Sequence, residues 1–144
     1  MQPRVARLML ISSIDAKSWL RIDLNDEGYY TSYDLEAFID IGHGVFSAHN
    51  SDIQLLHPES GIAQLDRLVT DRNVTAEFRG TYDTFLRFYR PRDTGSSIYL
   101  EFLIGDALAA PPETIQYSLR GAFEIDQEYI LRILDDFRKL TCKE

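Results

Sequence analysis

The chain has 144 residues, of which 44% are hydrophobic and 26% charged, a balance typical of one globular domain. It carries 23 acidic against 15 basic side chains and a formal net charge of -8 at pH 7. This charge disfavours binding to nucleic-acid phosphates and favours a basic partner. The single cysteine, Cys142, excludes an internal disulfide and a multi-cysteine zinc site, and it fits a reducing, cytoplasmic location. No stretch approaches the roughly 20 apolar residues that a membrane-spanning helix needs.

The first 50 residues contain segments with the two-residue period of β-strands. In residues 33–41 the alternate positions are apolar, and Asp34, Glu36 and Asp40 share the opposite face with Phe38. This pattern predicts a half-buried strand in an antiparallel sheet that has one face in solvent. Residues 19–24 alternate in the same way, and residues 45–48 follow a Gly-His-Gly turn, so we expect antiparallel neighbours there. The apolar run 8–14 ends at Asp15 without a cleavage pattern, which favours a strand over a secretory signal.

A helical period replaces the strand period after residue 57. Pro58 suits a first helical turn, and apolar residues recur at helical spacing as far as Val69, which predicts a helix of about three turns. Strands are predicted at residues 74–78, 84–90, 98–104 and 114–123, joined by loops at 91–97 and 106–113. A final helix over 126–140 has Asp126 as its N-cap and an apolar stripe: Ile130, Ile133, Leu134 and Phe137.

Together these elements predict an α+β fold. We expect a single domain over residues 1–144, with one largely antiparallel, twisted β-sheet of about six to eight strands. The middle helix and the C-terminal helix should pack on the apolar face of that sheet.

The side chains that commonly carry catalysis or bind metals form no motif in this sequence. His43, His49 and His57 lack the i, i+4 spacing of a helical zinc site. Residues 95–98 lack the flanking glycines of a nucleophile elbow, and residues 42–44 are too short for a phosphate-binding loop. We therefore expect no catalytic residue, no metal site and no cofactor, and a protein that is not an enzyme. The alternative is a small-ligand-binding protein or an enzyme, which would need a deep apolar pocket with convergent His and Asp side chains.

The strongest functional signal is the distribution of charge. Between Arg21 and Arg67 there is no lysine or arginine, whereas nine acidic residues occur there with tyrosines among them. Outward carboxylates steer a basic partner, and tyrosines are common at protein interfaces. The competing interpretation is a polar sheet face that the carboxylates keep soluble. The candidate partner-binding residues are Asp23, Asp26, Glu27, Tyr29, Tyr30, Asp34, Glu36 and Asp40.

Two short motifs resemble a known family. Residues 123–130 place an aromatic residue and then Asp126-Gln127 before the last helix, and an Arg79-Gly80 step precedes the aromatic-rich residues 82–88. With the order of elements and the length, this resembles the WapI-like immunity proteins of bacterial polymorphic toxin systems over residues 20–140. The resemblance implies a small, non-enzymatic protein that binds and blocks a cognate toxin. The matching positions imply only structural roles, with Asp126 as a cap, Gly80 in a turn and Phe123 in the core.

The predicted partner is therefore a cognate protein toxin, with no role for nucleic acid or a membrane. A toxin that acts on nucleic acid would itself be basic, because its substrate is a polyanion. An inhibitor that presents carboxylates could mimic this substrate and be steered onto the toxin's active site.

Overall fold

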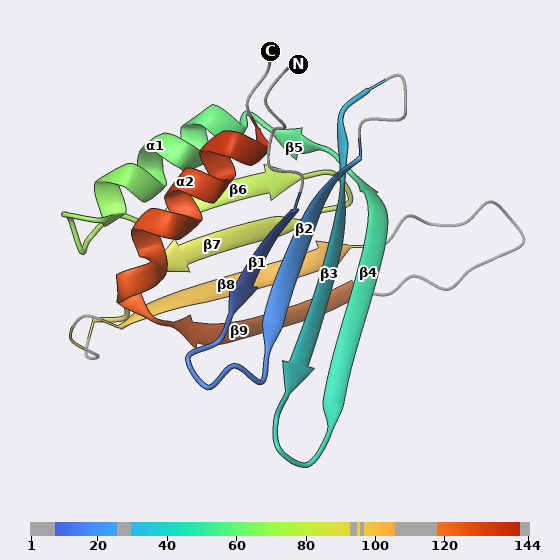
Figure 1. The fold of residues 1–144 in the computed structure, drawn as a ribbon, viewed down its shortest axis with the longest axis horizontal. Helices are drawn as coiled ribbons and strands as arrows, with labels where there is room; N and C mark the ends of the chain where they lie inside the picture. Colours follow the sequence, from blue (N-terminus) through green and yellow to red (C-terminus); the bar gives the residue numbers. More distant parts are fainter. Residues whose placement is uncertain (1–7, 26–29, 93–94, 96, 106–117, 142–144) are drawn as a thin grey trace, which may run out of the picture.

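The computed structural model describes residues 8–25, 30–92, 95, 97–105 and 118–141. These residues form two antiparallel sheets and two helices around a hydrophobic core (Figure 1), which confirms the predicted α+β fold. The first sheet has the order β1 (Leu8–Ser12), β2 (Trp19–Asn25), β3 (Ser32–Asp40), β4 (Val45–Ile53). The second has the order β5 (Leu55–Leu56), β6 (Ala76–Gly80), β7 (Phe85–Tyr89), β8 (Ile98–Gly105), β9 (Ser118–Ile125). The helices are α1 (Pro58–Leu68) and α2 (Ile130–Leu140), and a 3-10 turn, η1 (Gln127–Tyr129), precedes α2.

The strands are divided between two sheets, whereas we expected one sheet from the sequence pattern. The division lies at Gln54, between the end of β4 and the start of β5. The backbone N–H of Gln54 donates to Thr81 Oγ1, and the backbone N–H of Thr81 donates to the Gln54 carbonyl, both at 3.0 Å. Residue 54 is thus bonded to the end of β6 and not to β3. The chain then continues as β5, which pairs with β6, so the first sheet ends at β4.

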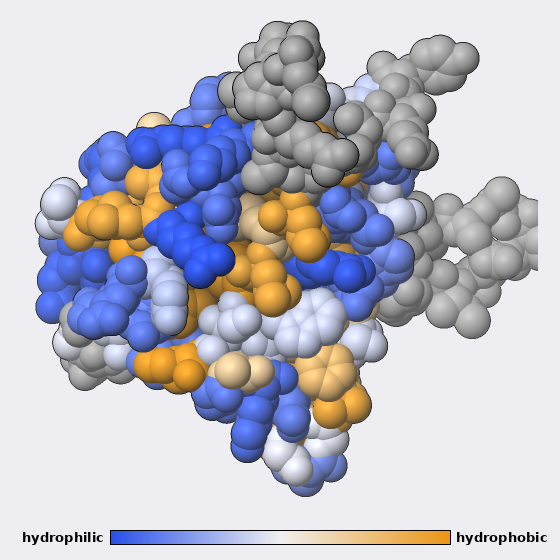
Figure 2. All heavy atoms as spheres, in the orientation of Figure 1, coloured by the Kyte–Doolittle hydropathy of each residue, from blue (hydrophilic) through white to orange (hydrophobic). Residues whose placement is uncertain are grey.

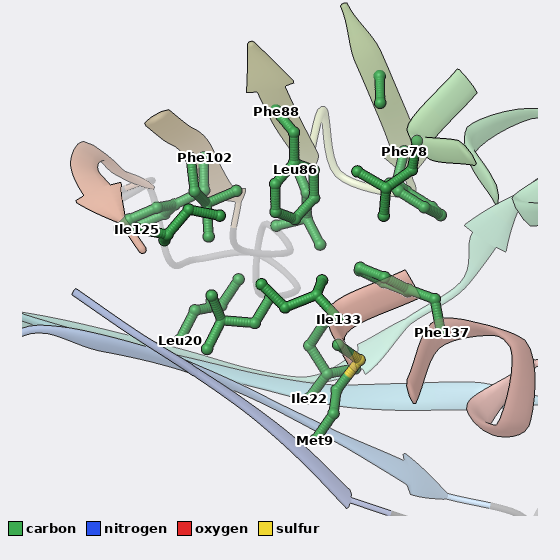
Figure 3. Packing of buried hydrophobic residues seen from close by; sticks show 14 of the residues in the cluster. Met9, Leu20, Ile22, Phe78, Leu86, Phe88, Phe102, Ile125, Ile133 and Phe137 are labelled. Carbon is green, nitrogen blue, oxygen red and sulfur yellow. The ribbon is translucent and has the colours of Figure 1, made fainter. Parts of the chain in front are cut away.

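The two sheets face each other across a shared apolar layer. In Figure 1 the strands of the first sheet cross those of the second, and α1 and α2 lie side by side over β6 and β7. Figure 3 shows Leu20 and Ile22 of β2 directed toward the second sheet, with Ile133 and Phe137 of α2 in the same layer. The outer face of each sheet is left to solvent, and the first of these faces carries the predicted acidic residues.

An aromatic cluster joins both helices to the second sheet. The ring of Phe137 stacks on Phe78 with centroids 4.1 Å apart, and it meets the edge of Phe88 at 6.0 Å. Gly61 brings α1 against the same cluster, because a Cβ at this position would lie 2.6 Å from the Phe78 ring. The close approach of α1 to β6 therefore depends on the absence of a side chain at residue 61.

A buried polar contact also connects the two sheets. The side chain of Asn50 on β4 donates from Nδ2 to the carbonyl of Gly105 at the end of β8 (2.7 Å). Its Oδ1 accepts from the backbone N–H of Asp52 (2.9 Å). Asn50 is only 8% exposed, so both of its polar atoms have the partners that a buried amide requires.

The element ends agree with several of the local predictions. Asp126 accepts a hydrogen bond from the Glu128 N–H (3.0 Å), which confirms it as the cap before the last helical segment. The predicted strand over 114–123 corresponds to β9 in part, since residues 114–117 lie outside the described residues and β9 continues to Ile125. The strand predicted over 45–48 is longer in the structure, where β4 continues to Ile53.

The aromatic cluster gives the first testable prediction. Phe137→Ala should lower the free energy of unfolding by about 3–5 kcal/mol, because it leaves a cavity between Phe78 and Phe88. The matched control is Leu131→Ala on the same helix, where the side chain is 60% exposed and a change within about 0.5 kcal/mol is expected. Urea unfolding monitored by circular dichroism measures both values. Equal effects of the two substitutions would show that α2 presents a different face to the core.

Candidate functional site

The outer face of the first sheet brings the predicted carboxylates of β2 and β3 side by side. Asp23 lies opposite Asp34 in the antiparallel register, and Arg21 lies opposite Glu36. Asp40 ends β3 on the same face, because residues 34, 36, 38 and 40 alternate with the buried positions of the strand. Four of the predicted residues therefore share one surface: Asp23, Asp34, Glu36 and Asp40.

Two of these carboxylates have a basic side chain beside them within the protein. Arg21 Nη2 lies 3.0 Å from Glu36 Oε2, and His49 Nε2 contacts Asp34 Oδ1. The sequence stretch without lysine or arginine thus does not give a uniformly negative surface. Arg21 precedes this stretch in sequence, yet the pairing of β2 with β3 places it within the carboxylate row.

The other two carboxylates have no ion pair among the described residues. Asp23 faces the like charge of Asp34 across the strand pair, an arrangement that destabilises a sheet by a few tenths of a kcal/mol or more. Asp40 accepts the backbone N–H of Gly42 (2.8 Å), which orders the turn after β3. Both side chains are partly exposed and remain available to an external cation.

The remaining predicted residues belong to the connection between β2 and β3. Asp26, Glu27 and Tyr29 lie outside the described residues. Tyr30 is exposed, and its hydroxyl donates to Asp52 Oδ1 at 2.9 Å. This hydrogen bond and the negative charge of Asp52 raise the pKa of the Tyr30 phenol above its ordinary value.

The apolar part of this face was not predicted from the sequence. Trp19 and Phe38 stack across β2 and β3 with ring centroids 5.8 Å apart and planes 12° from parallel. Leu8 and Leu10 of β1 are each more than half exposed, and Figure 2 shows apolar side chains among charged ones over this sheet. The sequence did contain a signal for this apolar part, because Phe38 occupies the same face of the strand as Asp34, Glu36 and Asp40. Aromatic side chains are enriched at the centre of protein interfaces.

A groove beside this face bears on the alternative that the protein binds a small ligand or is an enzyme. It has a volume of about 450 Å³ and lies between the end of β1 and the start of α2. Its charged lining consists of Asp126, Arg132 and Asp136, and no histidine belongs to it. Asp126 already caps the turn before α2. The groove therefore lacks the convergent His and Asp side chains that the enzyme alternative calls for.

Neither a metal cluster nor a membrane-spanning helix is found in the part of the chain that the structure describes. There, no three His, Cys, Asp or Glu side chains are arranged to hold a metal ion. The helices of this part are too short and too polar to cross a bilayer.

The outer face of the second sheet carries a different kind of charged surface. Arg87 bridges Glu77 and Glu101, at 3.3 Å and 2.7 Å, and Arg120 also binds Glu101 at 2.8 Å. The hydrogen bond from Arg120, together with that from Arg87, lowers the pKa of Glu101 below its ordinary value. These charges satisfy one another, so this face offers an incoming partner less than the first face does.

This network gives a pH-dependent prediction. Glu101→Gln should lower the free energy of unfolding by about 1 kcal/mol near neutral pH, because Arg87 and Arg120 lose their shared anion. A carboxylate with a lowered folded-state pKa stabilises the protein above its unfolded-state pKa. The difference between wild type and variant should therefore shrink as the pH falls below about 4.3.

The control is Glu124→Gln, which removes a carboxylate of β9 that has no ion pair among the described residues. Urea unfolding at several pH values between neutral and acidic compares the three proteins. A Glu101→Gln effect that is as large in acid as at neutral pH would mean that the network does not act through the charge of Glu101.

Comparison with known proteins leaves the fold and the site as the basis for a functional conclusion. No family model matches the chain, and no curated protein or solved structure shows a significant match to it.

Proposed function

We propose that this protein is a non-enzymatic immunity protein that binds and neutralises a cognate bacterial toxin through the outer face of the β1–β4 sheet. The observation that carries the proposal is the composition of this face. It combines exposed leucines and an aromatic stack with two carboxylates that lack an ion pair among the described residues. Apolar anchors surrounded by polar groups are typical of protein-binding surfaces.

The charge of the chain supports a basic partner. With a net charge of -8, the protein attracts cationic surfaces over a distance of about 10 Å at moderate ionic strength. A toxin that cleaves or modifies nucleic acid needs a basic active-site cleft. Carboxylates on neighbouring strands can occupy such a cleft in place of phosphates, and they would block the substrate by direct competition.

The opposition of Asp23 and Asp34 also supports a role in binding. Two carboxylates at facing positions cost the free protein stability, and a neutral side chain at residue 23 would remove that cost. A lysine or arginine of a partner placed between them converts the repulsion into two attractive contacts. A position that weakens the free protein and strengthens the complex is common at functional sites.

Co-expression tests the immunity function directly. The proposal predicts that a neighbouring gene encodes the cognate toxin. The toxin domain of that gene product should arrest growth of a heterologous bacterial host, and co-expression of this protein should restore growth. The two purified proteins should then elute together in size-exclusion chromatography. Growth arrest that persists in the presence of the folded protein, with no complex formed, would refute the proposal.

Substitution of the two carboxylates that have no ion pair among the described residues tests the binding face. Asp23→Asn with Asp40→Asn should leave the free energy of unfolding within about 0.5 kcal/mol of wild type, since the amide oxygen introduced at residue 40 can still accept the Gly42 N–H. The association rate with the toxin should fall about tenfold at low ionic strength and become less dependent on salt. Asp34 and Glu36 are left unchanged, because their removal would also release His49 and Arg21.

The matched control removes the same number of charges from outside the first sheet. Asp71→Asn with Glu124→Gln changes two carboxylates that have no ion pair among the described residues, and the amide oxygen introduced at residue 71 can still accept the Asn73 N–H. This variant should associate nearly as fast as wild type. Stopped-flow measurement at several salt concentrations compares the two double variants. If both slow association equally, the face contributes only net charge, and the binding surface lies elsewhere.

A further inference from the structure

The groove between β1 and α2 runs along a free edge of the first sheet. Among the described strands β1 pairs only with β2, so its other edge has no neighbouring strand in this part of the chain. Residues 10–14 and the turn that follows them line the groove on this edge. Side chains of η1 and α2 form the opposite wall, and the end of β9 lies beside it. Figure 1 shows the end of β1 and the start of α2 on this side of the molecule.

The hydrogen bonds of the turn after β1 show which peptide groups face the free edge. The Ser13 N–H donates to the Ser18 carbonyl on the side of β2 (2.8 Å), and the direction of the peptide groups alternates along an antiparallel strand. Residues 8, 10 and 12 therefore turn their N–H and C=O groups away from β2. Ile14 follows the same alternation, because its N–H donates to the Glu124 carbonyl of β9 (2.9 Å).

The inner side of this edge is apolar. Ile11 of β1 points into the core, whereas the Leu10 side chain points to the outer face and is 56% exposed. In a strand added to β1, a residue opposite Ile11 would also point inward. There it would meet Ile125 and Ile133, two buried side chains that line the groove. A residue opposite Leu10 would lie on the outer face of the sheet, where a polar side chain is tolerated.

The edge of β1 has none of the features that commonly prevent strand addition. Proteins protect free edges with lysine, proline or a β-bulge. The sequence of β1 from Leu8 to Ser12 contains no charged residue and no proline, and its register with β2 is continuous. An edge of this kind is a template for a further strand.

We propose that the groove receives an extended segment of a partner protein, which adds to β1 as an antiparallel strand. Leu10 and Ser12 can each exchange two backbone hydrogen bonds with this segment. The segment should alternate apolar and polar residues, with the apolar ones facing Ile125 and Ile133. It should be basic, because the groove lining carries two carboxylates against one guanidinium and the protein has a net charge of -8. This net charge also disfavours a second copy of the chain as the occupant.

Two methylated peptides test the strand pairing, whatever the identity of the partner. The parent probe is a blocked seven-residue peptide in which three threonines alternate with two valines between terminal lysines. With the valines turned toward the groove, the threonine N–H groups face β1 and the valine N–H groups face away. N-methylation of the first two threonine amides should therefore weaken binding about tenfold or more. N-methylation of both valine amides should change it by less than about threefold, as measured by isothermal titration calorimetry.

Hydrogen exchange locates the bound peptide on the protein. The amide protons of Leu10 and Ser12 should exchange more slowly when the parent peptide is bound. The amide of Ile11 is the internal control, because the alternation along β1 directs it to β2. Its exchange should change little.

A substitution in β1 tests the same edge from the side of the protein. Leu10→Pro removes an N–H that faces the groove and leaves the hydrogen bonds between β1 and β2 in place. The matched control is Ser47→Pro on β4, the other edge strand of this sheet. The Ile41 N–H donates to the Gly44 carbonyl (3.1 Å), so the same alternation turns the Ser47 N–H away from β3. Leu10→Pro should bind the parent peptide about tenfold more weakly than Ser47→Pro does.

Circular dichroism checks that both proline variants are folded, and the methylated peptides decide the question on wild type if Leu10→Pro is not. Equal binding of the two methylated peptides, or no binding of the parent peptide at about 1 mM, would overturn the proposal. A wild-type dimer in analytical ultracentrifugation that Leu10→Pro dissociates would also overturn it, because a second copy would then occupy the edge. The immunity function does not depend on these outcomes, since co-expression with the toxin tests it separately.

Discussion

The packing of Phe137 between Phe78 and Phe88 holds together elements that are distant in sequence. Phe137 comes from the last helix, and its two partners lie on β6 and β7. The same cluster receives α1 through Gly61, and α2 also contacts β1 of the first sheet. The C-terminal helix α2 therefore contributes to the core of both sheets. The inner face of the first sheet packs against this core, and the outer face of the same sheet carries the candidate site.

The two outer sheet faces use charge in different ways. On the second sheet, Glu77 and Glu101 alternate with Arg87 and Arg120 so that each of these four charges has an opposite neighbour, whereas Glu124 on the same face has no ion pair among the described residues. On the first sheet, Asp23 faces a like charge and Asp40 has no ion pair among the described residues. Both faces are open to water, so exposure alone does not explain the difference. We interpret the balanced face as structural and the unbalanced face as the one that meets a partner.

Much of the fold could be predicted from local patterns in the sequence. The two-residue period placed β2 and β3 with their buried faces correct, except that Ile41, expected on the buried face, follows the end of β3 and is 46% exposed. The Asp126 cap and apolar stripe defined the last helix. The division into two sheets could not be predicted, because it depends on the hydrogen bonds between Gln54 and Thr81. Those residues are 27 positions apart, and no strand pattern reports which strands become neighbours.

The candidate site was predictable to a smaller extent. Alternation alone put Asp34, Glu36 and Asp40 on one face. The Arg21–Glu36 ion pair and the contact of His49 with Asp34 depend on the register between strands, which the sequence does not specify. The stack of Trp19 on Phe38 depends on the same register, although Phe38 already stood among the acidic positions.

The buried side chain of Asn50 on β4 also affects the outer face of the first sheet, because it helps to fix the register between β3 and β4. If β4 shifted by one residue relative to β3, Asn50 would turn to solvent and His49 would enter the core. The two hydrogen bonds of the buried Asn50 amide oppose this shift more strongly than an apolar residue would, since leucine tolerates several alignments. One buried polar group thus encodes the alignment that sets Ser47 beside Phe38. The arrangement of this outer face is in this sense specified from inside the protein, by a residue that is buried.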